Sequence, residues 1–308
     1  MSNREQIQAM KRSANDHCDT LAWPTVVLAA VVVPTYFLTP VAVVAWGLPV
    51  IAGVIIMGLL TYAGYTALHE SVHGAVCGGQ QRHRWLNELV GHAAAIPLGI
   101  PMSAHRYEHF LHHNHTNKQH EDPDLVCADM TGSVWRMVAS PVILFGNQYS
   151  LFLSGRWGTA HTELRRTFVL ETVAIVLSRV LLLAALFGPV AASAGAPLLS
   201  VALDVFLTLV LGPILGMVLL VYLFAYLVHV PHSVQGKFLD TSIFVLPRWF
   251  RGLGTWCWGF QNYHGIHHAF PRVPWYRYRE VFEANQEALM EQGMPTFELS
   301  GLNWRRVN

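Results

Sequence analysis

Hydrophobic and polar positions form long blocks along this chain instead of alternating over a few residues. No charged residue occurs from Leu21 to Leu68, and a second apolar block from Phe168 to Val228 contains only three charged residues. About 20 apolar residues cross a bilayer as a helix, so each block predicts two membrane-spanning helices. Pro34 and Pro40 are expected near the first reversal of the chain, and Ala191–Pro197 near the second.

The positions of the basic residues predict how these helices are oriented. Every Lys and Arg except Arg179 lies in residues 1–20, 69–167 or 231–308, and neither predicted hairpin turn contains one. Because basic loops favour the cytoplasmic side of a membrane, both termini and the segment between the hairpins are expected in the cytoplasm. The predicted fold class is an all-α integral membrane protein of the bacterial inner membrane, with four transmembrane helices in two hairpins and a cytoplasmic helical cap. The first apolar block is too long for a secretory signal.

Three shorter segments complete the expected secondary structure. Residues 83–103 and 135–153 are half apolar and interrupted by prolines, which predicts interfacial or re-entrant helices. Tyr276–Gly293 alternates charged and apolar residues at helical spacing, which predicts a surface helix of the cap. No internal repeat or long linker occurs, so residues 1–308 are predicted to form a single membrane-embedded domain.

Composition restricts the function further. The chain is 53% hydrophobic and only 13% charged, and its formal net charge of +1 gives no basic surface for nucleic acid. The four cysteines are far apart and form no CxxC pair, which excludes a cysteine zinc site, a plant-type iron–sulfur cluster and a dithiol redox motif. Histidine is the exception, since the 17 histidines nearly equal the 20 Lys and Arg residues in number. This excess indicates a metal-binding protein.

The histidines gather in three clusters, and the predicted hairpins bring all three to the cap. Their members are three or four residues apart, so that each cluster presents its imidazoles on one helical face. The clusters are His69 and His73, then His109, His112 and His113, and finally His264, His267 and His268. A ninth imidazole, His229, lies where the fourth helix emerges. Nine imidazoles exceed one tetrahedral zinc site, but they suit two metal ions with open positions, and imidazole is a good ligand for iron.

Two segments around these clusters carry a family resemblance. They are HFLHHNHTN at residues 109–117, followed by EDPD at 121–124, and QNYHGIHHAFPRVPWYRY at 261–278. Together with HxxxH at His69, they resemble the histidine boxes of the membrane fatty acid desaturase superfamily, from about Leu68 to Met294. Within that superfamily, the last segment and residues 226–232 most resemble bacterial carotenoid ring hydroxylases and ketolases. Those proteins have Leu-Pro-His where this chain has Leu-Val-His229, which leaves both His229 and His232 as candidates for the extra ligand.

The resemblance implies an oxidoreductase with two iron ions that uses O2 to oxidise C–H bonds of a lipid-soluble substrate. It implies no catalytic side chain beyond the metal ligands, which are expected to be His69, His73, His109, His112, His113, His229, His264, His267 and His268. Other polar residues are expected to orient these imidazoles through their far nitrogen atoms. These residues are His105, His115, Asp122, Asp124, His232 and Asn262.

Expectations about substrate and partners complete this interpretation. The resemblance favours hydroxylation of a carotenoid ring, with desaturation or hydroxylation of a fatty acyl lipid as the alternative. The chain has neither a CxxC cluster nor a Gly-rich dinucleotide loop after a strand. A separate ferredoxin- or cytochrome-type electron donor and its reductase are therefore expected as partners.

Two alternatives from other classes rest on the same histidines. His69–His73 also matches the HExxH signature of zinc hydrolases, in which Glu70 would act as general base. An intramembrane zinc metalloprotease of this kind leaves the second and third clusters without a role. A histidine-rich metal transporter requires ligands at the membrane midplane, where the sequence has none. Metal content separates the three classes: two irons, one zinc, or variable loading.

The distribution of basic residues yields a test of topology. Reporter tags at both termini and within residues 131–165 should be reached only from the cytoplasm, because these segments carry the positive charge. A tag within Ala191–Pro197 should be reached only from the opposite side. An externally accessible C-terminus would contradict the predicted orientation and would separate the third histidine cluster from the other two.

Overall fold

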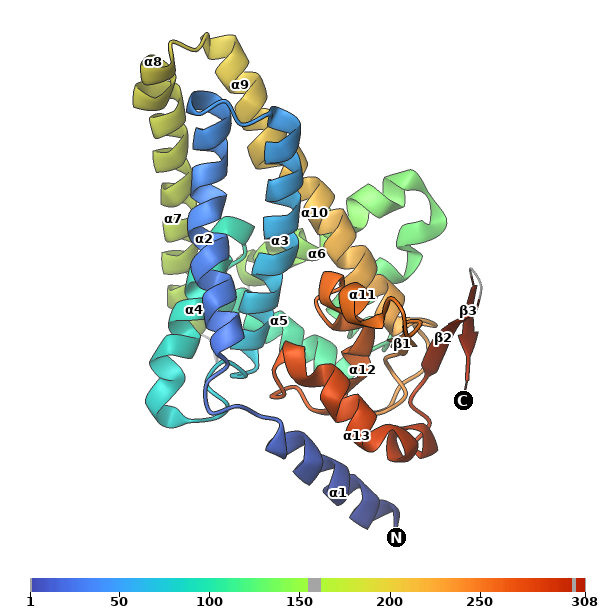
Figure 1. Cartoon of the computed structure of the whole chain (residues 1–308). Coiled ribbons are helices and arrows are strands. Elements are labelled where there is room, and N and C mark those ends of the chain that lie inside the picture. Colours follow the sequence, from blue (N-terminus) through green and yellow to red (C-terminus); the bar gives the residue numbers. More distant parts are fainter. Residues whose placement is uncertain (1, 155–161, 301–302, 308) are drawn as a thin grey trace.

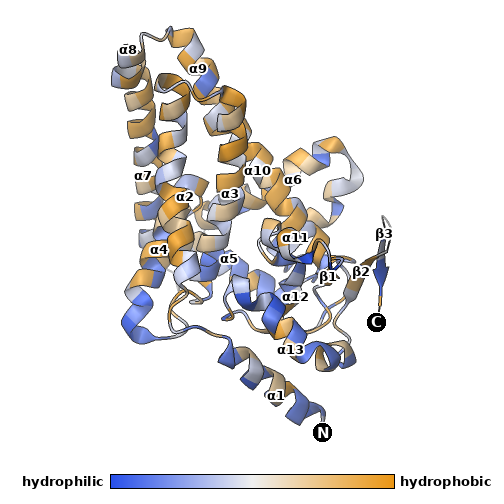
Figure 2. Ribbon diagram, viewed as in Figure 1, coloured by the Kyte–Doolittle hydropathy of each residue, from blue (hydrophilic) through white to orange (hydrophobic). Residues whose placement is uncertain are grey.

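A computed structural model describes residues 2–154, 162–300 and 303–307. Within these residues, four helical segments are long and apolar enough to cross a membrane, and they form the tall bundle in Figure 1. The segments are Trp23–Ala45, Val50–Val72, Leu164–Ala194 and Leu198–His229. They form two hairpins whose turns lie at the same end of the bundle, and apolar residues concentrate on them (Figure 2). The predicted integral membrane architecture of four helices in two hairpins is confirmed.

The first hairpin turns later than its prolines suggest. Helix α2 (Trp23–Ala45) continues through Pro34 and Pro40, so the chain reverses several residues after the prolines near which the reversal is expected. The chain reverses after α2, where Gly47 adopts a left-handed φ of 73°, and α3 (Val50–Val72) then begins. A membrane helix tolerates proline because hydroxyl side chains and neighbouring helices satisfy the freed carbonyls. In α2, two threonine hydroxyls donate to the carbonyls of Val31 and Thr35, which adjoin the carbonyls of Ala30 and Tyr36 that the prolines leave free.

The second hairpin contains several irregular turns. Its elements are α7 (Thr162–Ala185), η4 (Leu186–Val190), α8 (Ala191–Ala194), α9 (Leu198–Phe206), η5 (Leu207–Leu211), α10 (Gly212–Leu220), η6 (Val221–Tyr226) and η7 (Leu227–His229). Pro189 lies in one π-helical turn and Pro213 directly follows another, because proline removes a hydrogen bond from the helix. The chain reverses between α8 and α9, inside the predicted segment, with Gly195 in the left-handed conformation. The last irregular turns lead directly to His229.

Helix α3 lies at the centre of the bundle and packs closely against α10. Gly212 and Gly216 form a GxxxG sequence on α10, and both approach α3. A Cβ atom added at Gly216 would lie 2.4 Å from the Gly58 carbonyl oxygen and 2.8 Å from the Cβ of Thr61. Small residues allow membrane helices to approach this closely. The contact holds the histidine-bearing ends of α3 and of the fourth segment beside each other.

The other helices form a cap at the histidine-bearing end of the bundle (Figure 1). They are α1 (Asn3–Asp16), η1 (Gln81–His83), α4 (Arg84–Leu98), α5 (Met102–His115), η2 (Pro123–Gly132), α6 (Val134–Leu153), α11 (Arg251–Cys257), η8 (Gln261–Tyr263), α12 (His264–Ala269), η9 (Trp275–Arg277) and α13 (Tyr278–Glu291). Helices α4, α6 and α13 form where half-apolar or alternating segments predict helices. The cap is therefore helical and rich in histidine, as expected.

The all-α prediction omits a small three-stranded sheet in the cap. Strand β1 (Ile243–Val245) pairs in parallel with β2 (Thr296–Ser300), which pairs antiparallel with β3 (Asn303–Arg306). The Phe244 ring packs 5.1 Å from the ring of Phe297, which is its partner in the β1–β2 register. Strands of three to five residues carry too little alternation to be recognised in a sequence.

Gly216→Ala should lower the free energy of unfolding by about 1–3 kcal/mol, because its methyl group overlaps the backbone of α3. Thermal unfolding in detergent, followed by circular dichroism, measures this loss. Gly146→Ala on α6 is a matched control, since a Cβ atom at Gly146 meets no atom within 4 Å. Equal unfolding midpoints for the two variants would contradict the close contact between α3 and α10.

Candidate metal centre

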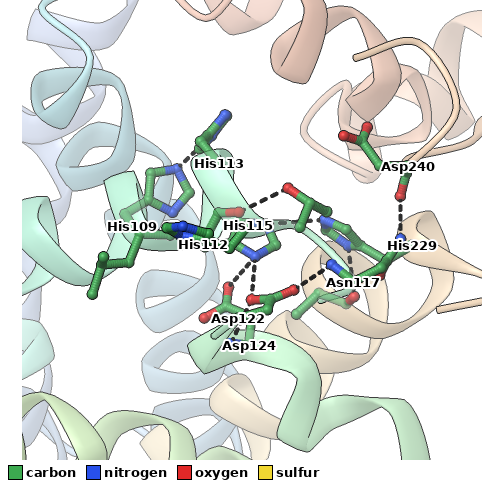
Figure 3. Close-up of polar contacts among 12 residues, drawn as sticks. His109, His112, His113, His115, Asn117, Asp122, Asp124, His229 and Asp240 are labelled. Atoms are coloured by element: carbon green, nitrogen blue, oxygen red, sulfur yellow. Dashed lines mark hydrogen bonds and ion pairs between the residues drawn. The ribbon is translucent and has the colours of Figure 1, made fainter. Parts of the chain in front are cut away.

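The three histidine clusters meet at the ends of the membrane-spanning helices. The first cluster ends α3, the second lies on α5 and the third on α12, while His229 ends the fourth membrane-spanning segment. Figure 3 shows the second cluster on α5 with His229 beside it. A core of Tyr263, Ile266 and residues of α13 holds α12 from behind. Clusters far apart in the sequence thus share one site, as the predicted topology requires.

Five histidines form the first group of potential ligands. His69, His73, His109, His113 and His267 come from three helices, and one nitrogen of each lies within 4.8 Å of a nitrogen of every other. The Nε2 atom of His113 lies 3.0 Å from Nε2 of His109 and 2.9 Å from Nε2 of His267. This spacing brings the five nitrogens around one position.

A second group lies directly beside the first. His112, His229 and His268 have nitrogens within 4.8 Å of one another, and the His268 ring stacks on His113 of the first group with centroids 4.2 Å apart. The Nε2 atom of His229 lies 3.1 Å from Nε2 of His112 and 3.3 Å from Nε2 of His268. His264 completes the surroundings, with its ring centroid 5.0 Å from His229 and 4.8 Å from His268. Eight of the nine predicted ligands therefore form two adjacent groups, and His264 lies beside the second group.

The far nitrogens of four of these imidazoles are held by other groups. Their Nδ1 atoms contact Asp122 Oδ1 (His112, 2.8 Å), the Ala225 carbonyl (His229, 2.7 Å), Gln261 Oε1 (His264, 2.8 Å) and the Tyr278 hydroxyl (His267, 3.0 Å). An acceptor at Nδ1 fixes the Nδ1–H tautomer and leaves a lone pair at Nε2. The Nε2 atoms of His112 and His229 face each other at 3.1 Å, so a proton or a metal ion has to lie between them.

This arrangement fits bound metal ions. Ring nitrogens that face each other this closely need a proton or a metal ion between them. In addition, both ring nitrogens of His69 and Nε2 of His73 are buried without a hydrogen-bond partner in the described part of the chain. Buried polar atoms of this kind require a partner, and a metal ion is a partner for a neutral imidazole.

The electrostatics of the site also favour neutral imidazoles. Burial, reinforced by repulsion from other histidines, lowers the pKa of His73 to about 3. The same causes hold the pKa well below the usual range for His109, His113, His264, His267 and His268. His112 differs, because burial lowers its pKa but the nearby carboxylates of Asp124 and Asp122 raise it to about 9 overall. Neutral histidine is the form that binds metal, so most imidazoles of the site are already in the form that binds a cation.

Three of the six predicted supporting residues contact the predicted ligands. Asp122 accepts a hydrogen bond from His112 and another from the Asn117 backbone N–H at 2.7 Å, so its carboxylate is fixed on both sides. Asp124 lies 3.7 Å from His112 Nδ1. His105 stacks on His109 at 5.4 Å, and its Nδ1 accepts from the Gln148 amide at 3.1 Å.

The other three predicted supporting residues lie elsewhere. His115 contacts the Leu111 carbonyl and Glu121. Asn262 donates to the Phe244 carbonyl at 2.9 Å and thereby supports the segment before α12. None of its described contacts is with an imidazole. The His232 ring packs on Tyr226, whereas His229 joins the second group. The structure thus brings His229, and not His232, to the site.

Glu70 and Tyr278 belong to the site although no sequence pattern singles them out for this role. The Tyr278 hydroxyl donates to Glu70 Oε1 at 3.2 Å, and its oxygen faces His267 Nδ1. The other Glu70 oxygen accepts from the Trp275 backbone N–H at 3.2 Å. Glu70 therefore supports His267 through Tyr278. This carboxylate is engaged away from the imidazole nitrogens, which disfavours the zinc hydrolase interpretation of HExxH. Gln261 precedes His264 by three residues, which is a helical spacing, so its contact with His264 could be predicted from the sequence.

A small cavity adjoins both groups of histidines. Its apolar lining comes from Leu144 and Phe145 of α6 and from Leu220, Val221 and Phe224 of the fourth membrane-spanning segment. Its polar and aromatic lining consists of His109, His112, His229, His264, Asp124 and Tyr65. An apolar group inside this cavity would therefore lie directly against the metal positions.

Comparisons with known proteins give a family. The sequence model of the family described as fatty acid desaturase matches residues 45–300. The sn-1 oleoyl-lipid 12-desaturase of Anabaena variabilis is 29% identical over 163 residues, which are 51% of this chain and 44% of that protein. The sn-1 oleoyl-lipid 12-desaturase of a Picosynechococcus species is 33% identical over 122 residues, which are 39% of this chain and 33% of that protein. The chain thus aligns with less than half the length of either relative.

Tyr278→Phe removes only the hydroxyl that joins His267 to Glu70. We expect its metal affinity to fall about 10–100-fold, the usual effect of losing the partner of a ligand's far nitrogen. Titration of the metal-free protein with Fe²⁺ under anaerobic conditions measures the affinity. Tyr276→Phe is the matched control, because the Tyr276 hydroxyl donates to Asp19. An affinity of Tyr278→Phe equal to that of Tyr276→Phe would contradict the role of this hydroxyl.

Proposed function

The chain belongs to the fatty acid desaturase family, a family of oxidoreductases, and we propose that it desaturates the acyl chain of a membrane lipid with two iron ions and O2. The observation that carries this proposal is the cavity whose lining combines apolar side chains with members of two adjacent groups of histidines. Oxidation of an unactivated C–H bond requires a strong oxidant next to that bond, and binding of a lipid chain requires an apolar surface.

The iron ligands follow from the two groups. We assign His69, His73, His109, His113 and His267 to one ion, and His112, His229, His264 and His268 to the other. Imidazole ligands suit iron, and the iron ions supply the activation of O2 and the oxidising power. The balanced reaction converts –CH2–CH2– and O2, with two electrons and two protons, into –CH=CH– and two molecules of water.

The protein's own residues position the reacting groups and exclude water. Asp122 and the Glu70–Tyr278 pair hold imidazoles from opposite sides of the site, so their Nε2 atoms stay directed inward. Phe224 and Leu220 line the cavity next to His264 and His229, which leaves little room for water beside the oxidised carbon.

The comparisons support an acyl lipid better than a carotenoid ring as substrate. The two relatives reported above are named as oleoyl-lipid desaturases, whereas the resemblance to carotenoid hydroxylases rests on short segments around the third histidine cluster. The carotenoid interpretation is therefore the weaker one. Hydroxylation of the same acyl chain is the second candidate, because the ligand set is compatible with both outcomes.

The reaction needs electrons from outside the chain. The cysteines are free and scattered over the sequence, so a separate ferredoxin- or cytochrome-type donor with its reductase is proposed as the partner. The basic residues flanking the membrane-spanning helices support a cytoplasmic location for the cap and both termini. Such a donor would then reach the cap from the cytoplasm.

Expression in a bacterium that contains both carotenoids and monounsaturated acyl lipids tests the proposal. Mass spectrometry of fatty acids should reveal a new double bond, and the purified protein should hold close to two irons. His112→Ala and His267→Ala should lose iron and product, whereas His17→Ala should lose neither, because His17 contacts the Ser13 carbonyl at the end of α1. Unchanged fatty acids together with an oxidised carotenoid would refute the proposed substrate, and one zinc with full activity would refute the iron centre.

A further inference from the structure

Helix α11 and the turn before it expose an unusually apolar surface in the cap. Trp249, Leu253 and Trp256 are 86%, 61% and 66% exposed. Leu253 and Trp256 are three residues apart on α11 and therefore lie on one helical face, and Trp249 lies in the turn that leads into the helix. Contiguous exposed apolar surface marks an interaction site, and no described residue of the chain covers this face.

Hydrogen bonds at the end of α11 fix its depth relative to the membrane-spanning helices. The Tyr62 hydroxyl of α3 donates to the Trp258 carbonyl at 2.9 Å, and the Trp258 indole N–H donates to the Leu223 carbonyl of η6 at 3.2 Å. Tyr62 precedes His69 by seven residues, which places this contact about 10 Å along α3 toward the hairpin turns. Helix α11 therefore lies against the sides of two membrane-spanning segments and not below their ends.

The composition of the segment agrees with this depth. Residues 252–260 contain no charged side chain, whereas Arg248 and Arg251 lie at the other end of the segment. Tryptophan and arginine with this distribution are typical of helices at a membrane interface, where indole rings enter the headgroup region and guanidinium groups extend to water. From these observations we propose that α11 inserts into the membrane leaflet on the histidine side and binds lipid through Trp249, Leu253 and Trp256.

The surrounding surface favours lipid over a protein partner. Leu59 of α3 and Leu215 and Leu219 of α10 are also exposed, on the two spans nearest to α11. A bilayer that covers these leucines extends to α11 without interruption, because Trp258 joins α11 to both spans. The apolar face of α11 is thus a continuation of the lipid-facing surface.

Insertion of α11 has a consequence for the metal centre. The third histidine cluster begins three residues after Gln261, and Gln261 itself follows α11 by only a few residues. Lipid on one face of α11 and the hydrogen bonds of Trp258 on the other therefore hold this cluster over the ends of the spans. The membrane acts as part of the support of the site.

A spin label at Cys257 tests the insertion, because this cysteine is exposed on α11 while Cys77 and Cys127 are buried. The protein carries Cys18→Ser and is reconstituted into lipid nanodiscs. Power-saturation electron paramagnetic resonance then compares collisions with O2, which concentrates in the bilayer, and with a water-soluble nickel chelate. A label on Glu287→Cys, an exposed position of α13, is the reference for water, with Cys257→Ser in the same chain. We expect the ratio of O2 to nickel collisions to be several-fold higher at Cys257 than at the reference.

Two outcomes would overturn the proposal: a ratio equal to that of the reference, or protection of Cys257 from both reagents, which would indicate a protein partner. A charge on the apolar face provides a second measurement. Leu253→Glu should raise nickel accessibility at Cys257, whereas Val234→Glu, at another exposed apolar position of the cap, should not. Neither measurement depends on iron content or on the product, so they remain valid if the proposed desaturase activity is wrong.

Discussion

Nine imidazoles pack against one another and are largely shielded from water. Hydrogen bonds within the protein do not satisfy all of their ring nitrogens. Where Nδ1 is held by an acceptor, Nε2 carries a lone pair, and the Nε2 atoms of neighbouring rings approach to 2.9–3.3 Å. Protonation relieves this repulsion at His112, where Asp122 and Asp124 raise the pKa, but burial lowers the pKa of the other predicted ligands outside the membrane-spanning segments. Cations between the lone pairs remove it. The rest of the fold is arranged around this requirement.

Two kinds of contact keep the imidazoles in place. Glycines on α10 bring the fourth segment against α3, and the Phe224 ring, shortly before His229, lies 5.0 Å from the His69 ring. In addition, two carboxylates outside the group of imidazoles hold ligand rings in place. Asp122 contacts His112 directly, and Glu70 supports His267 through Tyr278. A buried carboxylate costs free energy unless it is hydrogen-bonded, and both accept hydrogen bonds from backbone N–H groups as well.

The sequence predicts the spans and the histidine clusters well because both rest on local regularities, namely hydrophobic runs and helical spacing. It fails where the outcome depends on neighbours. Pro34 and Pro40 look like helix ends, yet they remain inside α2 because a membrane helix satisfies its carbonyls in other ways. Tyr278 and Glu70 are 208 residues apart, so no spacing rule joins them. Asn262 lies next to the third histidine cluster, yet it donates to the carbonyl of Phe244 in β1 and not to an imidazole.

Substrate identity is harder to predict than metal chemistry for a physical reason. Ligand histidines and their carboxylate supports are fixed by the needs of the metal, so they look alike whatever is oxidised. Selectivity depends instead on apolar walls such as Leu144, Phe145 and Val221, which belong to segments without any motif. Apolar contacts discriminate weakly, at about 1–3 kcal/mol per methylene group. Short segments around a histidine box therefore carry little information about substrate, whereas an alignment that extends into the cavity-lining helices carries more.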